Sequence, residues 1–466
     1  MRSETSWTGL MKNPKLQPAL LTLLFFGVYT TEKLRITIGP TRFRYSLIVL
    51  IVVFLISCLH RPAKVFRQAV KSPALLAWIP FLILSGLSVM LGEQPKKTGP
   101  IWAYNAITLA VCWHFSRILP WQKVARPLLW ALVAHTTLLF WDEFAIAGWF
   151  PQTWALGNLY PTANTFRASG LYVAPQFYGT AIGLTAWMWL SAQREFKFFS
   201  RDALFVGFVF AGLWLNYSRT AWLMISFTGL LSIAWLSLHT LKSEPIREPW
   251  AKSVLWVLGF TFGFFWLSNI APEQHADLQR KFSPRQTWAR FCPSLQEEFS
   301  FQWSCPPLDP SIETDRSSTT NSEGRRFSEW RIAFKSLNED PWLGKGYTPV
   351  SIGVDDDHLI HASNPSSLAT QAVRLDYRFE SVLALVLSDY GILGFASLLG
   401  AILWLIFRTR NVYAAAAWLA FWLVGSHSSQ VFARLDIWLP TFLFLETAIR
   451  SGREQTSSPE SSGSPT

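Results

Sequence analysis

Two arginines stand where guanidinium groups could bind an anion at the edge of a membrane. Arg219 belongs to a Ser-Arg-Thr-Ala-Trp run, residues 218–222, that opens an apolar segment. Arg326 belongs to an Arg-Phe-Ser-Glu-Trp run, residues 326–330, in a long polar loop. A guanidinium binds phosphate oxygens through paired, charge-assisted hydrogen bonds. If both residues lie at one membrane face, their chemistry would suit an anionic, lipid-linked ligand.

Each arginine also has a simpler interpretation. Arg219 could snorkel from the end of a span to the membrane interface. Arg326 could form ordinary ion pairs in a loop that also holds Arg325 and Arg331. Arg167, which precedes another apolar segment, could be an interfacial anchor. The types of residue therefore indicate a site without excluding a structural role.

Membrane helices must position these residues. Half of the 466 residues are hydrophobic and 15% are charged, and apolar runs long enough to cross a bilayer recur throughout. The composition predicts an all-α polytopic membrane protein with about twelve spans. The predicted spans are residues 17–30, 45–59, 75–91, 101–116, 127–141, 176–193, 203–217, 220–240, 254–270, 380–407, 412–427 and 435–449.

The charge distribution predicts how the spans are oriented. The net charge is +11, but the basic residues lie mainly in short loops between alternate spans, as the positive-inside rule expects, which argues against nucleic-acid binding. With a cytoplasmic N-terminus, both termini lie inside, and residues 142–175, the turn before Arg219 and residues 271–379 face outward. The predicted outer loop at residues 31–44 opposes the rule, because it holds four basic residues.

This topology divides the chain into four parts. Residues 1–270 form an N-terminal bundle of about nine spans, residues 271–379 an extracytoplasmic loop domain, and residues 380–450 the C-terminal spans. Residues 451–466, rich in Ser, Glu, Pro and Gly, have no apolar surface to bury and are predicted to be a disordered cytoplasmic tail.

The outer loop domain contains a predicted disulfide and a predicted helix. Cys292 and Cys305 are the only cysteines predicted outside the membrane in an oxidising compartment, so we expect them to be paired. The spacing of Phe327, Trp330, Phe334 and Leu337 predicts an amphipathic helix over residues 326–338, ended by Pro341. Its apolar stripe is expected to rest on the membrane face of the bundle.

Separated segments of the chain resemble, in the same order, the O-antigen ligase and polymerase-like membrane proteins. Residues 218–223 are similar to the family's Ser-Arg-x-Ala-Trp signature at the start of a span. Residues 324–331, followed by Pro341, Gly344 and Gly346, resemble its Arg-x-x-x-Trp helix with a Pro and Gly-x-Gly tail. Residues 167–176 resemble the segment that enters a span, with Gln176 in place of the usual Asn, and residues 389–394 resemble the span after the outer loop.

The resemblance implies a GT-C-like fold in the bacterial plasma (inner) membrane. It also implies transfer or polymerisation of an oligosaccharide, as in O-antigen or exopolysaccharide, from an undecaprenyl-diphosphate carrier onto an acceptor hydroxyl. The acceptor would be a glycan or a lipid A core, and neither metal nor other cofactor is expected. Arg219, Arg326 and Arg167 would bind the diphosphate, whose charge grows as the sugar leaves.

The acceptor hydroxyl also needs a base to take its proton. The family's ligases have a His-Asn pair at the outer entrance of the span after the long loop, where this chain has Glu380 followed by Ser381. Glu380 is the predicted base by position, and His361, in the preceding loop, is the alternative. Either residue could instead lie on the surface.

Other classes of function receive less support from the sequence. Asp355, Asp356, Asp357 and His358 lack the spacing of a calcium or zinc site, so we interpret them as a solvated acidic turn. No phosphate-binding glycine loop or nucleotide fingerprint is present. A transporter or lipid-linked glycan flippase is the alternative function, and it would need charged or broken helices near mid-membrane. A third hypothesis is a structural protein that holds anionic lipid.

Overall fold

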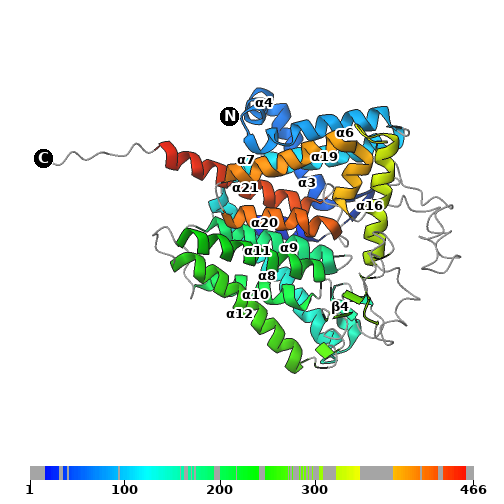
Figure 1. The fold of residues 1–466 in the computed structure, drawn as a ribbon. Coiled ribbons are helices and arrows are strands. Elements are labelled where there is room, and N and C mark those ends of the chain that lie inside the picture. The colour runs from blue at the N-terminus through cyan, green and yellow to red at the C-terminus, as the bar shows by residue number, and fades with distance from the viewer. Residues whose placement is uncertain are drawn as a thin grey trace.

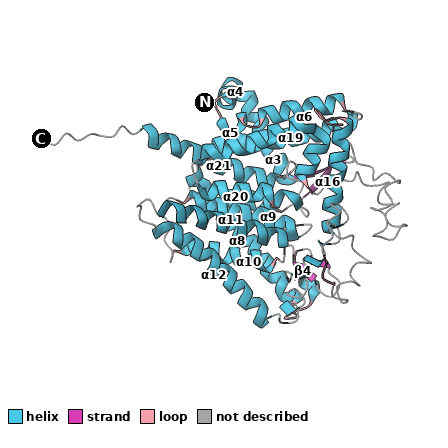
Figure 2. Ribbon diagram, in the orientation of Figure 1, coloured by secondary structure: helices cyan, strands magenta, loops and turns pink. Residues whose placement is uncertain are grey.

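The chain folds into a bundle of helices with two short β-hairpins (Figures 1 and 2). A computed structural model describes residues 16–30, 35–38, 41–92, 95–157, 159–161, 166–168, 170–172, 175–193, 200–216, 218–240, 247–270, part of 272–307, 322–346, 381–409, 412–428 and 434–457. The predicted helical class is confirmed for these residues, apart from the hairpins.

The elements follow one another in this order along the chain. They are α2 (Leu16–Tyr29), β1 (Arg35–Ile38), β2 (Thr41–Arg44), α3 (Tyr45–His60), α4 (Pro62–Val70), α5 (Pro73–Leu76), α6 (Ile79–Leu91), α7 (Pro95–Ile118), α8 (Trp121–Ile146), the 3-10 turn η1 (Gln152–Trp154), β3 (Leu159–Pro161), β4 (Phe166–Ala168), α9 (Pro175–Ala192), α10 (Arg201–Leu215), α11 (Arg219–Thr240), α12 (Arg247–Ile270), α16 (Ser322–Glu339), α19 (Val382–Thr409), α20 (Val412–Leu423), the 3-10 turn η3 (Gly425–Ser428) and α21 (Leu435–Ser457).

Every predicted span overlaps a helix, but fewer helices are by themselves long and apolar enough to cross a membrane. Among the described residues three qualify, namely Pro73–Leu91, α8 and α19, or up to four if α3 and α4, bent by 107° at their junction, count as one span. The central helix α9 is not among them, although residues 178–191 are all buried. A helix enclosed by other helices can carry Thr180, Thr185 and Ser191, because its hydroxyls bond to backbone carbonyls of the preceding turn.

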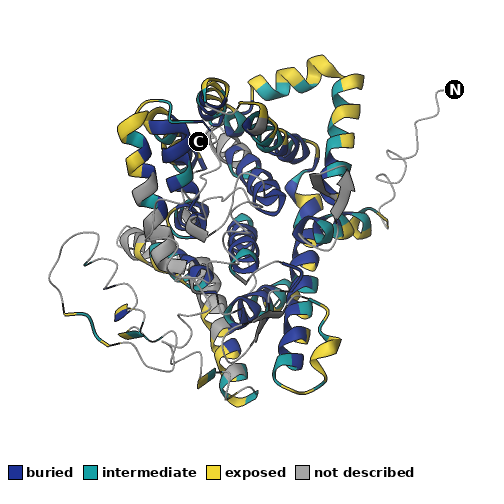
Figure 3. Cartoon of the chain, turned by 90° about the vertical axis from the view of Figure 1, so that its right-hand side faces the viewer, coloured by how far each residue is buried: buried dark blue, intermediate teal, exposed yellow. Residues whose placement is uncertain are grey.

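The buried apolar residues form one large core that includes both ends of the chain. It extends from Leu21 in α2 to Ile449 in α21, so the C-terminal spans pack within the N-terminal bundle. Figure 3, viewed toward the side on which α16 lies, shows buried residues in the middle of the bundle and exposed residues around its rim.

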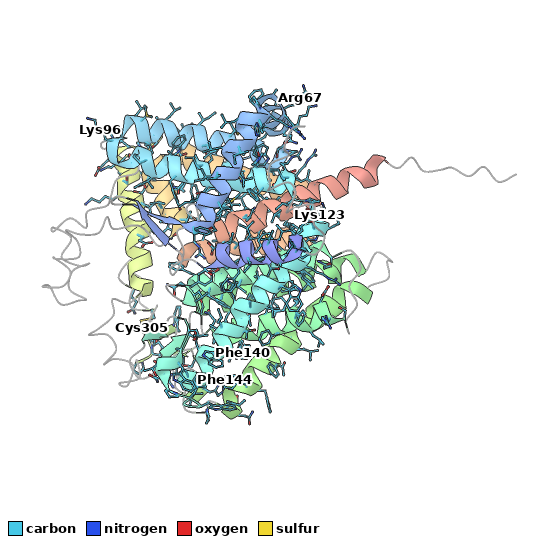
Figure 4. The ribbon with its side chains drawn as sticks, turned by 180° about the vertical axis from the view of Figure 1, so that it is seen from behind. Arg67, Lys96, Lys123, Phe140, Phe144 and Cys305 are labelled. Atoms are coloured by element: carbon cyan, nitrogen blue, oxygen red, sulfur yellow. A yellow bond between two sulfur atoms is a disulfide. The ribbon has the colours of Figure 1, made fainter. Side chains whose placement is uncertain are left out.

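The bundle has two distinct ends, which Figure 4 separates. Lys96 and Cys305 lie toward one end, and Arg67 and Lys123 lie toward the other. Helix α16 and the β3–β4 hairpin lie at the first end (Figure 1), which we call the loop end, and we call the other the basic end. The predicted topology also places Arg67 and Lys123 on one side and Cys305 on the opposite side.

Two less apolar segments contain regular structure that the sequence did not predict. Residues 31–44, expected as a loop, contain the antiparallel hairpin β1–β2, in which Arg35 pairs with Arg44 and Thr37 with Arg42. The C-terminal tail is helical up to Ser457, because α21 continues beyond its apolar part. Residues 458–466 of the predicted tail lie outside the described residues.

Candidate functional site

The Ser-Arg-Thr-Ala-Trp run forms the tight start of α11. The Ser218 hydroxyl accepts a hydrogen bond from the Ala221 N–H over 3.3 Å, which satisfies a free donor of the first helical turn. The Trp222 indole N–H lies 3.2 Å from the carbonyl oxygens of Leu213 and Trp214, in the last turn of α10. These contacts fix the first residue of α11, Arg219, at the junction of two antiparallel helices.

The β3–β4 hairpin is held against the same junction. The backbone N–H of Ala168 donates to the Glu143 carboxylate of α8 over 3.4 Å, and its carbonyl oxygen accepts from the Asn216 side chain over 3.5 Å. Asn216 ends α10, two residues before Ser218. Arg167, the neighbour of Ala168 in β4, is therefore anchored through its backbone beside the start of α11.

Helices α9 and α11 run in the same direction. A Cβ added at Gly179 would lie 3.4 Å from the Cβ of Ser218, and one at Gly183 would lie 3.2 Å from Ile225. The later glycine of α9 therefore faces the later residue of the α11 segment, as expected for parallel helices. The N-termini of the two helices consequently meet at the loop end.

Helix α21 is parallel to α9 as well. Arg434, just before α21, donates a hydrogen bond of 3.0 Å to the Phe177 carbonyl in the first turn of α9. Further along, the Thr441 hydroxyl lies 3.9 Å from the Met188 sulfur. Three helix N-termini, those of α9, α11 and α21, therefore converge at the loop end, where their partial positive charges favour an anion.

The loop helix α16 confirms the predicted helix, beginning four residues earlier than expected. Its predicted packing face was partly wrong, because Phe334 is exposed while Ala333 and Ser336 are buried. Ser336 donates to the Ser388 carbonyl of α19 over 3.2 Å. Trp330 and Leu337 of the stripe pack against the cluster that Ala333 forms with α19, whereas Phe334 turns away, because small residues allow α16 to lie close to α19.

A buried carboxylate of α16 binds the start of α19. Glu329 accepts a hydrogen bond of 2.8 Å from the Ser381 N–H, and the Ser381 hydroxyl accepts one of 3.4 Å from the Ala384 N–H. A carboxylate at a helix N-terminus is electrostatically favourable. The Arg-Phe-Ser-Glu-Trp run therefore contributes a structural residue, Glu329, beside its arginine.

The tail after α16 fills a break in α19. Gly391 interrupts α19 with φ +62° and ψ −166°. The N–H groups of the next two residues donate to the Pro341 and Trp342 carbonyls over 2.9 and 3.1 Å, and the Gly346 N–H donates to the Asp389 carbonyl over 2.9 Å. The Pro and Gly-x-Gly tail and the Asp-Tyr-Gly segment of the sequence thus form one joint.

The predicted site residues are described to different extents. Arg219, Arg167 and Arg326 lie on elements at the loop end, on α11, β4 and α16, and their side chains lie outside the described part of the structure. Glu380 and His361 lie outside the described residues. The predicted disulfide between Cys292 and Cys305 is present. Within the described residues, no group of three or more His, Cys, Asp and Glu side chains could hold a metal.

Sequence reasoning missed the buried polar groups around this junction. Glu143, Asn216, Arg434 and Asp436 are each at most 5% exposed. A signal existed for the last two, because an Arg and an Asp two residues apart at the start of an apolar span are expensive to bury and rarely lack a role. Nothing in the local sequence marks Glu143 or Asn216, whose partners are distant in the chain.

Comparison with protein-family models gives no match, and no curated protein matches the chain. Membership of the O-antigen ligase and polymerase-like family stays a prediction from the sequence segments.

Proposed function

We propose that the protein is a membrane glycosyltransferase that transfers or polymerises an oligosaccharide from an undecaprenyl-diphosphate carrier. The observation that carries the proposal is the junction at the loop end of the bundle. There the N-termini of α9, α11 and α21 meet, and the chain bearing Arg167 and Arg219 is fixed through Ala168 and Ser218. A diphosphate is the kind of ligand that such a concentration of positive ends and guanidinium groups binds.

The chemistry follows from what these groups favour. When the glycosidic carbon leaves the carrier oxygen, negative charge accumulates on the diphosphate, and donors already in place lower the energy of that state. Arg219, Arg167 and Arg326 are the proposed donors. The acceptor hydroxyl loses its proton to Glu380 or His361, and the new bond forms between its oxygen and the sugar. No metal is needed for this step, because guanidinium groups supply the charge.

The predicted number of spans, fold and membrane location belong to the same proposal. About twelve spans in a GT-C-like arrangement, in a bacterial plasma membrane with the loop end outside, would put the site where lipid-linked glycans are accessible. The break in α19 does not favour the alternative function of a transporter. Its break at Gly391 is closed by backbone hydrogen bonds from residues 341–346, whereas a transporter's broken helix presents its freed backbone to an ion or substrate.

The test is product formation by the purified protein from an undecaprenyl-diphosphate-linked oligosaccharide of its own host, resolved by glycan length. Without a second acceptor, a polymerase gives a ladder of products. A ligase leaves the oligosaccharide unchanged until a lipid A core or another acceptor is added. Either product should disappear in Arg219→Ala protein that still inserts into the membrane. If no acceptor yields product, the glycosyltransferase proposal is wrong, and flipping of the same lipid across vesicles would be measured instead.

A further inference from the structure

Arg434 is a buried guanidinium whose hydrogen-bonding capacity is only partly used. Its Nε donates to the Asp436 carboxylate over 3.1 Å, and its Nη2 donates to the same carboxylate and to the Phe177 carbonyl. The aromatic rings of Tyr172 and Phe177 flank the group, with centroids 5.7 and 5.1 Å from Cζ. The remaining nitrogen, Nη1, is buried and has no hydrogen-bond partner among the described residues.

The surroundings of this arginine contain further partial positive charges besides its ion pair with Asp436. Arg434 stands at the N-terminus of α21 and bonds to the first turn of α9, so its charge lies beside two positive helix ends. Asp436 neutralises one unit of charge. The two N–H groups on Nη1 remain without a hydrogen-bond partner among the described residues, and an unsatisfied charged donor in a protein interior is strongly unfavourable.

We propose that Arg434 is a phosphate-binding residue of the junction, with Nη1 as the donor and Asp436 as the residue that holds the guanidinium plane. The ligand is the phosphate of a membrane lipid, and its identity as the carrier diphosphate rests on the proposed function. The segment that follows Arg167 links this residue to Arg434. Its Ala168 is hydrogen-bonded to Asn216, and its Tyr172 lies beside Arg434. Arg434 would thus extend the set of cations around one lipid-linked phosphate.

A purely structural ion pair makes a different prediction, which a double substitution separates. Replacing a buried ion pair by apolar residues of similar size usually preserves folding. One double variant would carry Arg434→Met and Asp436→Leu together. The control would be a second double variant at the basic end, which carries Arg117→Met and Glu446→Leu. Binding of undecaprenyl diphosphate and of phosphatidylglycerol to each detergent-solubilised protein would be measured by native mass spectrometry, alongside thermal unfolding.

We expect the Arg434 and Asp436 double variant to unfold at nearly the wild-type temperature and to bind undecaprenyl diphosphate at least tenfold more weakly, with no change in the matched pair. If only the binding of undecaprenyl diphosphate weakens, the ligand is the carrier substrate. If the binding of phosphatidylglycerol weakens equally, the site binds lipid headgroups in general. Unchanged binding of both lipids by the folded variant overturns the proposal.

If the double variant fails to fold, Arg434→Lys replaces it. A lysine keeps a charge beside Asp436 but lacks the second nitrogen of the guanidinium fork, so binding should again weaken at least tenfold. Undiminished binding by Arg434→Lys would overturn the proposal. Because the readout is binding, a protein that binds the carrier but transfers no sugar would refute the glycosyltransferase and leave the phosphate site standing.

Discussion

The two ends of the bundle contain the same local motif in different surroundings. At the basic end, the Ser200 hydroxyl accepts from the Ala203 N–H over 3.2 Å, and Arg201 is the first residue of α10. At the loop end, the Ser218 hydroxyl accepts from the Ala221 N–H over 3.3 Å, and Arg219 is the first residue of α11. Both are Ser-Arg-x-Ala runs that begin a helix with a capping serine.

The difference lies in what surrounds each arginine. Arg201 is exposed. The start of α11 instead lies beside two parallel helix N-termini and the buried pair of Arg434 and Asp436. A capping motif alone therefore produces a helix start, and the convergence of distant segments is what makes one of the two starts a candidate anion site.

The largest expected effect comes from breaking the two buried ion pairs of α21, one at its start near the loop end and one in its middle near the basic end. Asp436→Ala leaves Arg434, whose side chain is 6% exposed, without its partner, and should destabilise the protein by about 3–5 kcal/mol. Glu446→Ala leaves Arg117, whose side chain is 20% exposed and can turn toward water, so we expect about 1–3 kcal/mol. Thermal unfolding in one detergent would measure both, and equal losses would contradict the distinction between the ends.

The two arginines that follow the capping serines, Arg219 and Arg201, provide the sharpest test of function. Arg219→Ala should reduce turnover of the lipid-linked oligosaccharide by about 100-fold to 1000-fold, the usual effect of removing a preorganised charge-stabilising donor. Arg201→Ala removes the same side chain from the same helix position at the basic end, and should leave turnover within about twofold. Comparable losses in both variants would mean that Arg219 acts through insertion or folding rather than through the substrate.

The halves of α19 can be compared through two glycines. Alanine at Gly391 must adopt a φ of +62°, and its Cβ would meet the Trp342 carbonyl at 2.6 Å, so Gly391→Ala should destabilise by about 1–3 kcal/mol or more and loosen α16. Gly400 has open space around an added Cβ, so Gly400→Ala should stabilise by about 0.5–1 kcal/mol. Thermal unfolding and protease cleavage of the loop after α16 would measure both. Equal responses would show that the joint with residues 341–346 does not hold the loop end.

Sequence patterns predict the elements of this protein better than their junctions. Apolar periodicity located a helix at every predicted span, and the 327–337 spacing located α16, because both signals are local. The hairpin at 31–44 was missed although Ile36, Thr37 and Ile38 are β-branched, since the segment was interpreted only as a connection between two apolar spans. The backbone partners of Arg434, Glu143 and Gly391 are remote in sequence, so no local pattern could show which backbone each meets, although the Arg434 and Asp436 spacing was visible.

The serine caps should separate stability from activity. Ser218→Ala and Ser200→Ala each remove one N-cap hydrogen bond and should each destabilise by about 1 kcal/mol. Turnover should fall several-fold only in Ser218→Ala, because that cap orients the backbone of Arg219. A Ser200→Ala protein that loses as much turnover as Ser218→Ala would show that activity follows general stability.

The smallest effect concerns pH and the tail that joins α16 to α19. The Lys345 ammonium donates a hydrogen bond to the Glu339 carboxylate and holds the pKa of that carboxyl below its usual value of about 4.5. A carboxyl with a lowered folded-state pKa stabilises the fold above its unfolded pKa, and this contribution is lost as pH falls through the folded value. Glu339→Gln should therefore melt slightly below the wild type at neutral pH and equal it in acid. The pair is exposed, so 0.5 M salt should shrink the difference. A difference that persisted in acid would assign the effect of Glu339 to packing, and the ion pair would then contribute nothing to the loop end.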